Sequence, residues 1–243
     1  MKFIFKRKKT PNIIDQYNPE SPSGIECQRL FKMLFTKGAS SGITSLMVTS
    51  SLPQEGKSIL IGNMALVAAG ANQRTVIIDA DMRRSVQSRR LHLPLTPGLS
   101  NYLQKEVEFD RILHDTKLEN LKLIPSGNRV SSPSGLLQLS IPEFKVLLNQ
   151  CQMFFDVVFV DTPPVIPVND SEIIAPLVDG VVLIVMAGKT YREIITRTLD
   201  LLGKSNCNLI GMILNNLTTA LPYYYSDSYY YSDPIWGDRS GGR

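Results

Sequence analysis

A short run of residues near position 56 combines the residue types that hold phosphate groups. Gly56, Lys57 and Ser58 close a polar loop that follows the apolar run Ser45–Thr49 and precedes a helical pattern. Such a loop turns backbone N–H groups inward at a helix N-terminus, where they bind anions. We expect Lys57 to place its charge on the β/γ-phosphates and Ser58 to offer its hydroxyl to Mg²⁺. The spacing predicts a phosphate-binding loop (P-loop).

Three aspartates follow two other apolar runs. Asp79 and Asp81 come directly after residues 75–78, two positions apart, on one side of the chain. Such a pair can hold Mg²⁺ through water and can accept a proton from an attacking hydroxyl. Asp161 ends the run Val157–Val160, as does the carboxylate that helps to hold the Mg²⁺ shell in P-loop proteins. The loop and the carboxylates, in this order, predict a nucleotide site.

Short apolar runs alternate with helical patterns through the middle of the chain. The runs are continuous, which is typical of strands covered by helices on both faces. Alternation of this kind predicts an α/β fold with a mainly parallel central sheet. Together with the phosphate-binding loop, it predicts the three-layer sandwich of the P-loop NTPases. Chemistry then gathers beyond the carboxyl ends of the strands. The expected strands are Ser45–Thr49, Thr75–Asp79, Leu121–Pro125, Val157–Asp161, Val181–Ala187 and Leu209–Leu214, and the expected helices are Lys57–Gly70, Pro142–Met153, Asn169–Leu177 and Thr190–Gly203.

Composition divides the 243 residues into three zones: a basic, polar arm (1–23), a P-loop domain (24–217) and a flexible tail (218–243). Five of the 26 basic residues fall in the first ten positions, and the rest of the chain holds 21 basic and 22 acidic residues. This balance gives no sign of the basic face that a nucleic-acid partner would need. The longest apolar run has seven residues, whereas a membrane-spanning helix needs about 20. The three cysteines lack metal or redox spacing, so we expect a reduced, cytosolic chain.

The tail contains six of the nine tyrosines of the chain, in two triplets. Almost no aliphatic residues lie beside them, so no core can account for them. An aromatic segment for stacking or self-association is one interpretation. The other is a set of exposed phosphoacceptor hydroxyls, which are Tyr223, Tyr224, Tyr225, Tyr229, Tyr230 and Tyr231.

The combination resembles the bacterial tyrosine kinases (BY-kinases) of the capsular and exopolysaccharide biosynthesis family. The P-loop Pro-Gln-Glu-Gly-Lys-Ser, the run Asp79-Ala80-Asp81-Met82-Arg83, the run Asp161-Thr162-Pro163-Pro164 and the tyrosine cluster carry the resemblance. It implies an autokinase that transfers the γ-phosphoryl group of ATP to the disordered tails of neighbouring copies and so regulates polysaccharide polymerisation and export. Since no spanning segment is expected, the chain looks like the free-standing, cytoplasmic kind.

The resemblance also implies roles for individual residues. ATP and Mg²⁺ are the expected cofactors, and Asp79 and Asp81 share the metal and base roles. Asp81 is favoured as the base, although the sequence does not separate the two. The implied catalytic residues are Lys57, Asp79 and Asp81; the metal residues are Ser58, Asp79, Asp81 and Asp161; the nucleotide-binding residues are Pro53, Gln54, Glu55, Gly56, Lys57, Ser58, Ile59, Arg83 and Asn215.

Partners follow from the same resemblance. The family builds a ring of subunits with a Glu-x-x-Arg-x-x-Arg stretch, which here reads Glu26, Arg29 and Lys32. The spacing puts the three charges on one helix face, but Lys32 lacks the bidentate fork of arginine. The other implied partners are a transmembrane activator or polysaccharide co-polymerase, which would keep the chain at the inner face of the membrane, and a cognate tyrosine phosphatase.

Two departures from the family pattern keep alternatives open. Ser51 stands where the strict P-loop has its first glycine, and Gln54 replaces another. A positive φ at Gln54 would cost about 1 kcal/mol relative to glycine. One alternative is a MinD/ParA-like ATPase switch without kinase activity, although residues 50–53 lack the additional lysine that is common there. The other is a catalytically weak scaffold that presents tyrosines.

Overall fold

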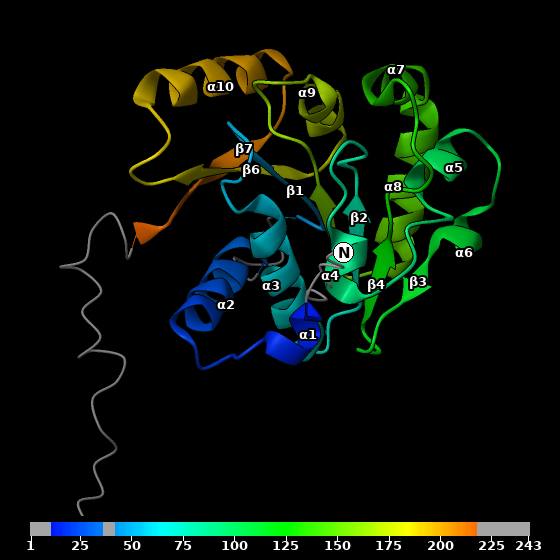
Figure 1. The fold of residues 1–243 in the computed structure, drawn as a ribbon, viewed down its shortest axis with the longest axis horizontal. Helices are drawn as coiled ribbons and strands as arrows, with labels where there is room; N and C mark the ends of the chain where they lie inside the picture. The colour runs from blue at the N-terminus through cyan, green and yellow to red at the C-terminus, as the bar shows by residue number, and fades with distance from the viewer. Residues whose placement is uncertain (1–10, 36–41, 218–243) are drawn as a thin grey trace, which may run out of the picture.

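The computed structural model describes residues 11–35 and 42–217 (Figure 1). Its strands are β1 (Ser45–Ser50), β2 (Thr75–Asp79), β3 (His114–Asp115), β4 (Leu121–Ile124), β5 (Val157–Asp161), β6 (Gly180–Met186) and β7 (Leu209–Asn215). Its helices are α1 (Ile13–Gln16), α2 (Pro22–Phe35), α3 (Lys57–Gly70), α4 (Gln87–Leu91), α5 (Leu99–Leu103), α6 (Phe109–Ile112), α7 (Pro133–Leu139), α8 (Ile141–Phe154), α9 (Asp170–Ile174), the 3₁₀ turn η1 (Ala175–Leu177) and α10 (Arg192–Lys204).

The sheet brings the three motif strands together. Its order is β3-β4-β2-β5-β1-β6-β7, and every pairing is parallel except the one between β3 and β4. The strands β2, β5 and β1 are therefore neighbours, and Asp79 is the register partner of Asp161. Parallel strands end at the same edge, so the P-loop and the aspartates emerge side by side.

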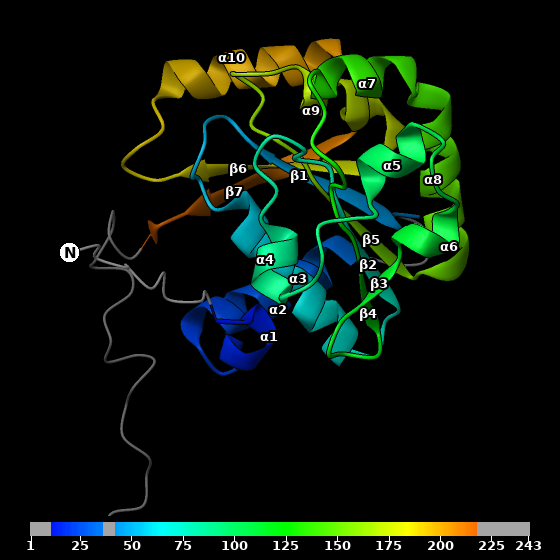
Figure 2. The same cartoon turned by 45° about the vertical axis from the view of Figure 1, so that its right-hand side comes forward.

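Helices cover both faces of the sheet and give the predicted three-layer sandwich. Figures 1 and 2 show α2 and α3 on one face and α9 and α10 on the other. The first face packs Leu46, Val48 and Phe159 against α1–α4, and the second packs Met47, Val158 and Val160 against α5–α10. Because successive strand residues point to opposite faces, each run must be apolar throughout. The motif strands β1, β2 and β5 are buried along their whole length.

The predicted strands and helices are confirmed, with ends that shift by one or two residues. The expected helix Asn169–Leu177 is an α-helical turn that tightens into 3₁₀ geometry at η1. The sequence did not indicate α1, β3, α4, α5, α6 or α7, which are all shorter than eight residues. Such elements carry too few turns to show a periodic pattern.

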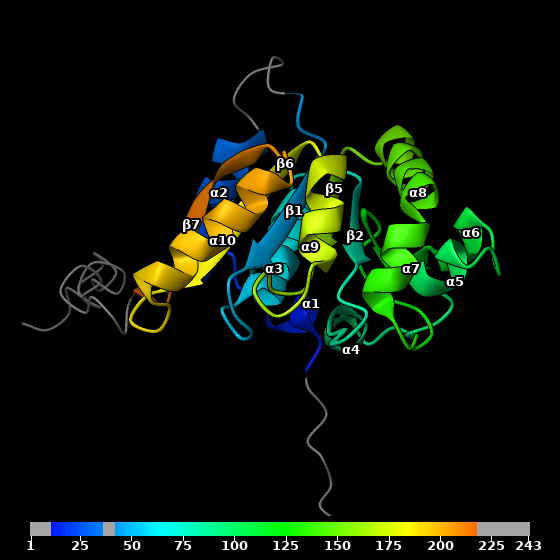
Figure 3. The ribbon, with the colours of Figure 1, turned by 90° about the horizontal axis from the view of Figure 1, so that it is seen from above.

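The arm boundary predicted at residue 23 is too late. The helix α1 buries Ile13, and Asn12 donates from Nδ2 to the carbonyl of Leu91 at 3.1 Å. The helix α2 begins at Pro22, and Figure 3 shows α1 and α2 with the rest of the domain. Residues 11–23 therefore belong to the folded domain. Residues 1–10 and the tyrosine cluster at 223–231 lie outside the described residues.

Candidate active site

The P-loop joins the buried end of β1 to the first turn of α3. Gly56 has φ 101°, and a Cβ atom there would lie 2.3 Å from Nδ2 of Asn215, so only glycine fits. Gln54 has φ 66°, which confirms that this position takes the left-handed conformation that glycine would adopt without strain. The loop therefore keeps the backbone path of a phosphate cradle despite its substitutions.

Two side chains brace the loop from within. Glu55 is 1% exposed, and its carboxylate accepts bonds from the backbone N–H of Leu52 at 2.9 Å and from the hydroxyl of Thr190. Ser51 is buried and accepts a bond from Oγ1 of Thr198 in α10 at 2.9 Å. The Glu55 side chain thus points into the protein and does not line the cavity.

Asn215 is a further brace at the end of β7. Its Nδ2 donates to the carbonyl of Glu55 at 2.9 Å, and its Oδ1 accepts from the backbone N–H of Asn216 at 2.8 Å. The residue still lines the same cavity as Gly56 and Lys57. Its amide is therefore committed to the loop, and its expected contact with the nucleotide base stays a prediction.

Lys57 lies among the aspartates. Its Nζ is 3.0 Å from Oδ2 of Asp81 and 3.6 Å from Oδ1 of Asp161. It also lies 3.4 Å from the hydroxyl of Ser58. Burial alone would lower the pKa of the ammonium, but the charges of Asp161 and Asp81 outweigh burial and raise that pKa. Lys57 therefore stays charged at the mouth of the cradle.

Asp79 lies deeper than Asp81 and is fully buried. Its Oδ2 accepts bonds from the hydroxyl of Ser85 at 2.7 Å and from the backbone N–H of Gln87 at 3.1 Å. Burial, reinforced by the charge of Asp161, raises the pKa of Asp79 to about 7. Asp81, by contrast, lines the cavity, and its Oδ1 accepts a hydrogen bond from the backbone N–H of Arg84 at 2.9 Å. This difference in position separates the two carboxylates that the sequence left equivalent.

The donor atoms around Ser58 fit a magnesium ion. Oδ1 of Asp79 and Oδ1 of Asp161 are buried without a hydrogen-bond partner. The described residues contain no group of three or more His, Cys, Asp and Glu side chains that could hold a metal. Mg²⁺ is usually bound by one or two carboxylates together with waters and substrate phosphates, so a dedicated protein cage is not required. Ser58, Asp79 and Asp161 would hold it.

Gln87 is a site residue that the sequence did not reveal. It is fully buried, and its Nε2 donates to Oδ2 of Asp161 at 2.8 Å and to the carbonyl of Ser58 at 3.0 Å. Its backbone N–H also donates a hydrogen bond to Asp79. Gln87 therefore holds both strand-end carboxylates and the first turn of α3 in place. The only signal in the sequence is a glutamine eight residues after Asp79, which fits no motif.

A cavity of about 650 Å³ opens above these residues. It contains every predicted nucleotide-binding residue except Glu55, while Asp79 and Asp161 lie behind its wall. Arg83, also predicted, is held at the wall: its Nη2 donates to Ser134 at 2.7 Å and its Nε lies 3.4 Å from the carboxylate of buried Asp170. The cavity is lined by Pro53, Gln54, Gly56, Lys57, Ser58, Ile59, Asp81, Arg83, Arg84, Val86, Arg89, Arg90, Pro163, Pro164, Pro167, Val168, Met186 and Asn215.

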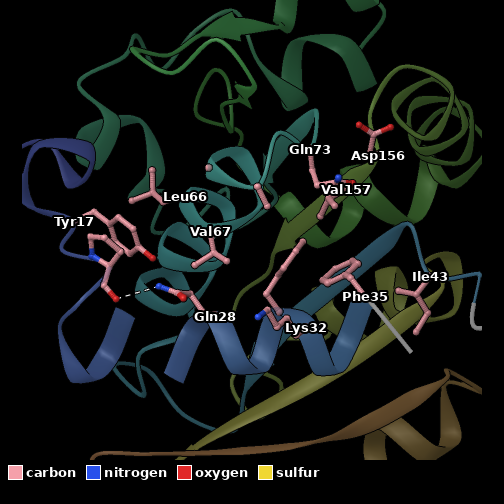
Figure 4. A pocket seen from close by; sticks show the side chains of 14 residues that line it. Tyr17, Gln28, Lys32, Phe35, Ile43, Leu66, Val67, Gln73, Asp156 and Val157 are labelled. Atoms are coloured by element: carbon pink, nitrogen blue, oxygen red, sulfur yellow. Dashed lines mark hydrogen bonds between the residues drawn. The ribbon is translucent and has the colours of Figure 1, made fainter. Parts of the chain in front are cut away.

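A second cavity, of about 740 Å³, lies at the other end of α3 (Figure 4). Mostly apolar side chains of α2 and α3 line it, and none of the phosphate-binding residues reaches it. Lys32 of the predicted ring motif lines this cavity. The other two ring residues pair with each other instead, with Nη1 of Arg29 2.7 Å from Oε1 of Glu26.

Comparisons with known proteins show the family of the chain. The model of the AAA domain family matches residues 43–197. The tyrosine-protein kinase CpsD of Streptococcus agalactiae is 34% identical over 180 residues, which cover 74% of this chain and 78% of that one. The chain belongs to the bacterial tyrosine kinases of the capsule family. Like those relatives, it is a kinase by family, and the resemblance seen in its sequence is confirmed.

Solved structures place the fold in the same family. The kinase domain of the Escherichia coli tyrosine kinase ETK matches with a TM-score of 0.78 at 27% identity, over 86% of this chain and 82% of that one. The septum site-determining protein MinD of Pyrococcus horikoshii matches with a TM-score of 0.59 at 14% identity, over 71% of this chain and 70% of that one. The MinD likeness shows the fold alone. No helix in residues 11–35 and 42–217 has the length and apolar character needed to cross a membrane.

Proposed function

We propose that this bacterial tyrosine kinase is an ATP-dependent autokinase that phosphorylates its C-terminal tyrosines in trans. The observation that carries the proposal is the close approach of Lys57 and Asp81, 3.0 Å apart beside the P-loop and on the wall of an open cavity. In the proposed function, Lys57 is the cation that binds phosphate and Asp81 is the base beside it. A carboxylate at this position can accept the proton of an attacking hydroxyl, as phosphoryl transfer to a tyrosine requires.

In the proposed mechanism, Lys57 and the N–H groups of the P-loop bind the β/γ-phosphates of ATP. When bound at Ser58, Asp79 and Asp161, Mg²⁺ supplies charge stabilisation to the phosphates. Because Lys57 is drawn toward the phosphates, its ion pair with Asp81 weakens and the carboxylate becomes free to accept a proton.

The transfer itself takes place in one step. The phenolic oxygen of an acceptor tyrosine forms a bond to the γ-phosphorus as the bond from that phosphorus to the bridging oxygen of ADP breaks. The phenolic proton passes to Asp81, and ADP leaves with the electron pair of the broken bond. Positioning and electrostatic stabilisation account for most of the catalysis in such reactions.

The proposal includes the assembly and partners that the resemblance implies. Glu26 and Arg29 lie on the outside of α2 with side chains 39% and 67% exposed, where they are accessible to a second copy in a ring. A transmembrane activator or polysaccharide co-polymerase would hold the cytoplasmic chain at the inner face of the membrane, and a tyrosine phosphatase would reset the tail. No nucleic-acid partner is proposed.

The test is the intact mass of the purified chain after incubation with Mg-ATP, with the cytoplasmic tail of the activator supplied or fused. Lys57→Met is the inactive control. We expect mass gains in steps of one phosphoryl group, mapped to residues 223–231 and absent in the control. ATP hydrolysis without any mass gain would instead indicate an ATPase switch, and neither reaction would indicate a scaffold that presents tyrosines.

A further inference from the structure

Four arginines on the wall of the nucleotide cavity differ in their burial and in their polar contacts. Arg83 is paired with buried Asp170. Arg90 is half-buried beside α3, its Nε carries no hydrogen bond, and burial lowers its pKa. Arg84 and Arg89 are exposed, and in the part of the chain that the structure describes neither forms an ion pair with a carboxylate. These two are free cations at the outer rim, beside the base Asp81.

The segment expected to enter this cavity is acidic and repeats itself. Tyr-Tyr-Tyr-Ser-Asp occurs at 223–227 and again at 229–233. Residues 222–238 contain three aspartates and no basic residue. The charge of this segment is therefore complementary to the rim.

The repeat also has a fixed geometry when a peptide binds in an extended form. Alternate side chains then share one face, about 7 Å apart from one to the next on that face. Over residues 223–233, the odd-numbered face reads Tyr223, Tyr225, Asp227, Tyr229, Tyr231 and Asp233, and the even-numbered face has no acid. A tyrosine that enters the cavity from the odd face therefore brings an aspartate toward the same wall.

We propose that Arg84 and Arg89 form an acidic-peptide subsite that binds the carboxylate two residues after an acceptor tyrosine. The acceptors that this rule selects are Tyr225, followed by Asp227, and Tyr231, followed by Asp233. The backbone N–H of Arg84 is bonded to the carboxylate of Asp81, so the rim cation and the base are fixed to one turn of the chain. A peptide held by its aspartate would thus present the preceding phenol near Asp81. This inference rests on the proposed autokinase function.

A binding measurement tests the subsite without requiring catalysis. The host is the full chain with its six clustered tyrosines changed to Phe and Asp227 and Asp233 changed to Asn, so that its own tail does not compete. The probe is a fluorescein-labelled peptide of residues 222–234, measured by polarisation in the presence of Mg-ADP. The double variant Arg84→Glu/Arg89→Glu is compared with Arg111→Glu/Lys145→Glu, which makes the same charge change at exposed positions of α6 and α8.

We expect the rim variant to bind the peptide at least about tenfold more weakly, since two charge-assisted bonds are lost. The matched control should bind it as the host does. A peptide with both aspartates changed to Lys should bind the rim variant better than the host. The affinity for ADP should be equal in all three proteins.

Three results would overturn the subsite: no peptide binding to the host, equal losses in the rim variant and its control, or a parallel loss of ADP affinity, which would assign the arginines to nucleotide phosphates. A time course of phosphorylation adds the order of modification, with Tyr225 and Tyr231 expected before Tyr224 and Tyr230. Rim-dependent binding without phosphoryl transfer would refute the autokinase function and leave the subsite standing. Transfer in random order, unchanged in the rim variant, would refute the subsite and leave the autokinase function standing.

Discussion

The buried carboxyl of Asp79 makes the stability of the nucleotide-free protein depend on pH. Its pKa is about 7 in the folded chain and 3.8 in a free side chain, so the folded state retains a proton between about pH 4 and pH 7 that the unfolded state releases. The stabilising contribution of the Asp79 carboxyl is therefore fully present below pH 4 and is lost as pH rises toward 7. A difference of this size corresponds to a loss on the order of 2 to 4 kcal/mol by pH 8.

The variant Asp79→Asn isolates this contribution because an amide mimics the protonated acid. The amide oxygen of the asparagine can accept the hydrogen bonds from Ser85 and Gln87. Its amide NH2 group takes the place of Oδ1 of Asp79, which has no hydrogen-bond partner. The assay is urea unfolding in EDTA at pH 5 and pH 8. We expect the wild type to lose more stability over this interval than Asp79→Asn, and the variant to be the more stable protein at pH 8. Equal losses in the two proteins, or a less stable variant at pH 8, would refute the reasoning.

Three further substitutions test the bracing of the site. Gln87→Leu removes the hydrogen-bond donor to Asp161 and is expected to raise the Mg²⁺ concentration for half-maximal ATP binding at least about tenfold. Nucleotide titration measures this concentration, and an unchanged value would contradict the prediction. Thr198→Val removes the buried bond to Ser51 and should cost about 1 to 2 kcal/mol in urea unfolding, whereas no loss would show that the bond adds nothing. Gln54→Gly should be about 1 kcal/mol more stable than Gln54→Ala in the same assay, because only glycine relieves the positive φ, and equal stabilities would argue against strain there.

The sequence predicted the parts of the site that lie on long buried elements. The strands β1, β2 and β5 are apolar runs that end in Gly-, Lys- or Asp-containing motifs, and the chemistry of phosphate and Mg²⁺ restricts which residues can follow them. Parallel pairing then makes their ends meet. The positive φ at Gln54 was also predictable, since the family pattern has glycine there.

Contacts between side chains far apart in the chain could not be predicted in this way. Gln87 reaches Asp161 across 74 positions, and Arg83 meets Ser134 across 51, through short elements without periodic pattern. Nor could the sequence say that the Glu55 carboxylate turns inward, because its partner Thr190 lies 135 residues away. Tertiary packing, and not local propensity, sets these contacts.

The bond from Asn215 to the P-loop has a consequence for synthesis of the chain. Asn215 ends β7, and its partner Glu55 precedes it by 160 positions. While the ribosome is still extending the chain, the phosphate cradle has emerged without the strand that braces it. A nascent chain is therefore expected to acquire a complete cradle only after nearly the whole domain has been made and β7 has left the ribosome. The order of the elements in the chain thus makes the active site one of the last parts of the domain to be completed.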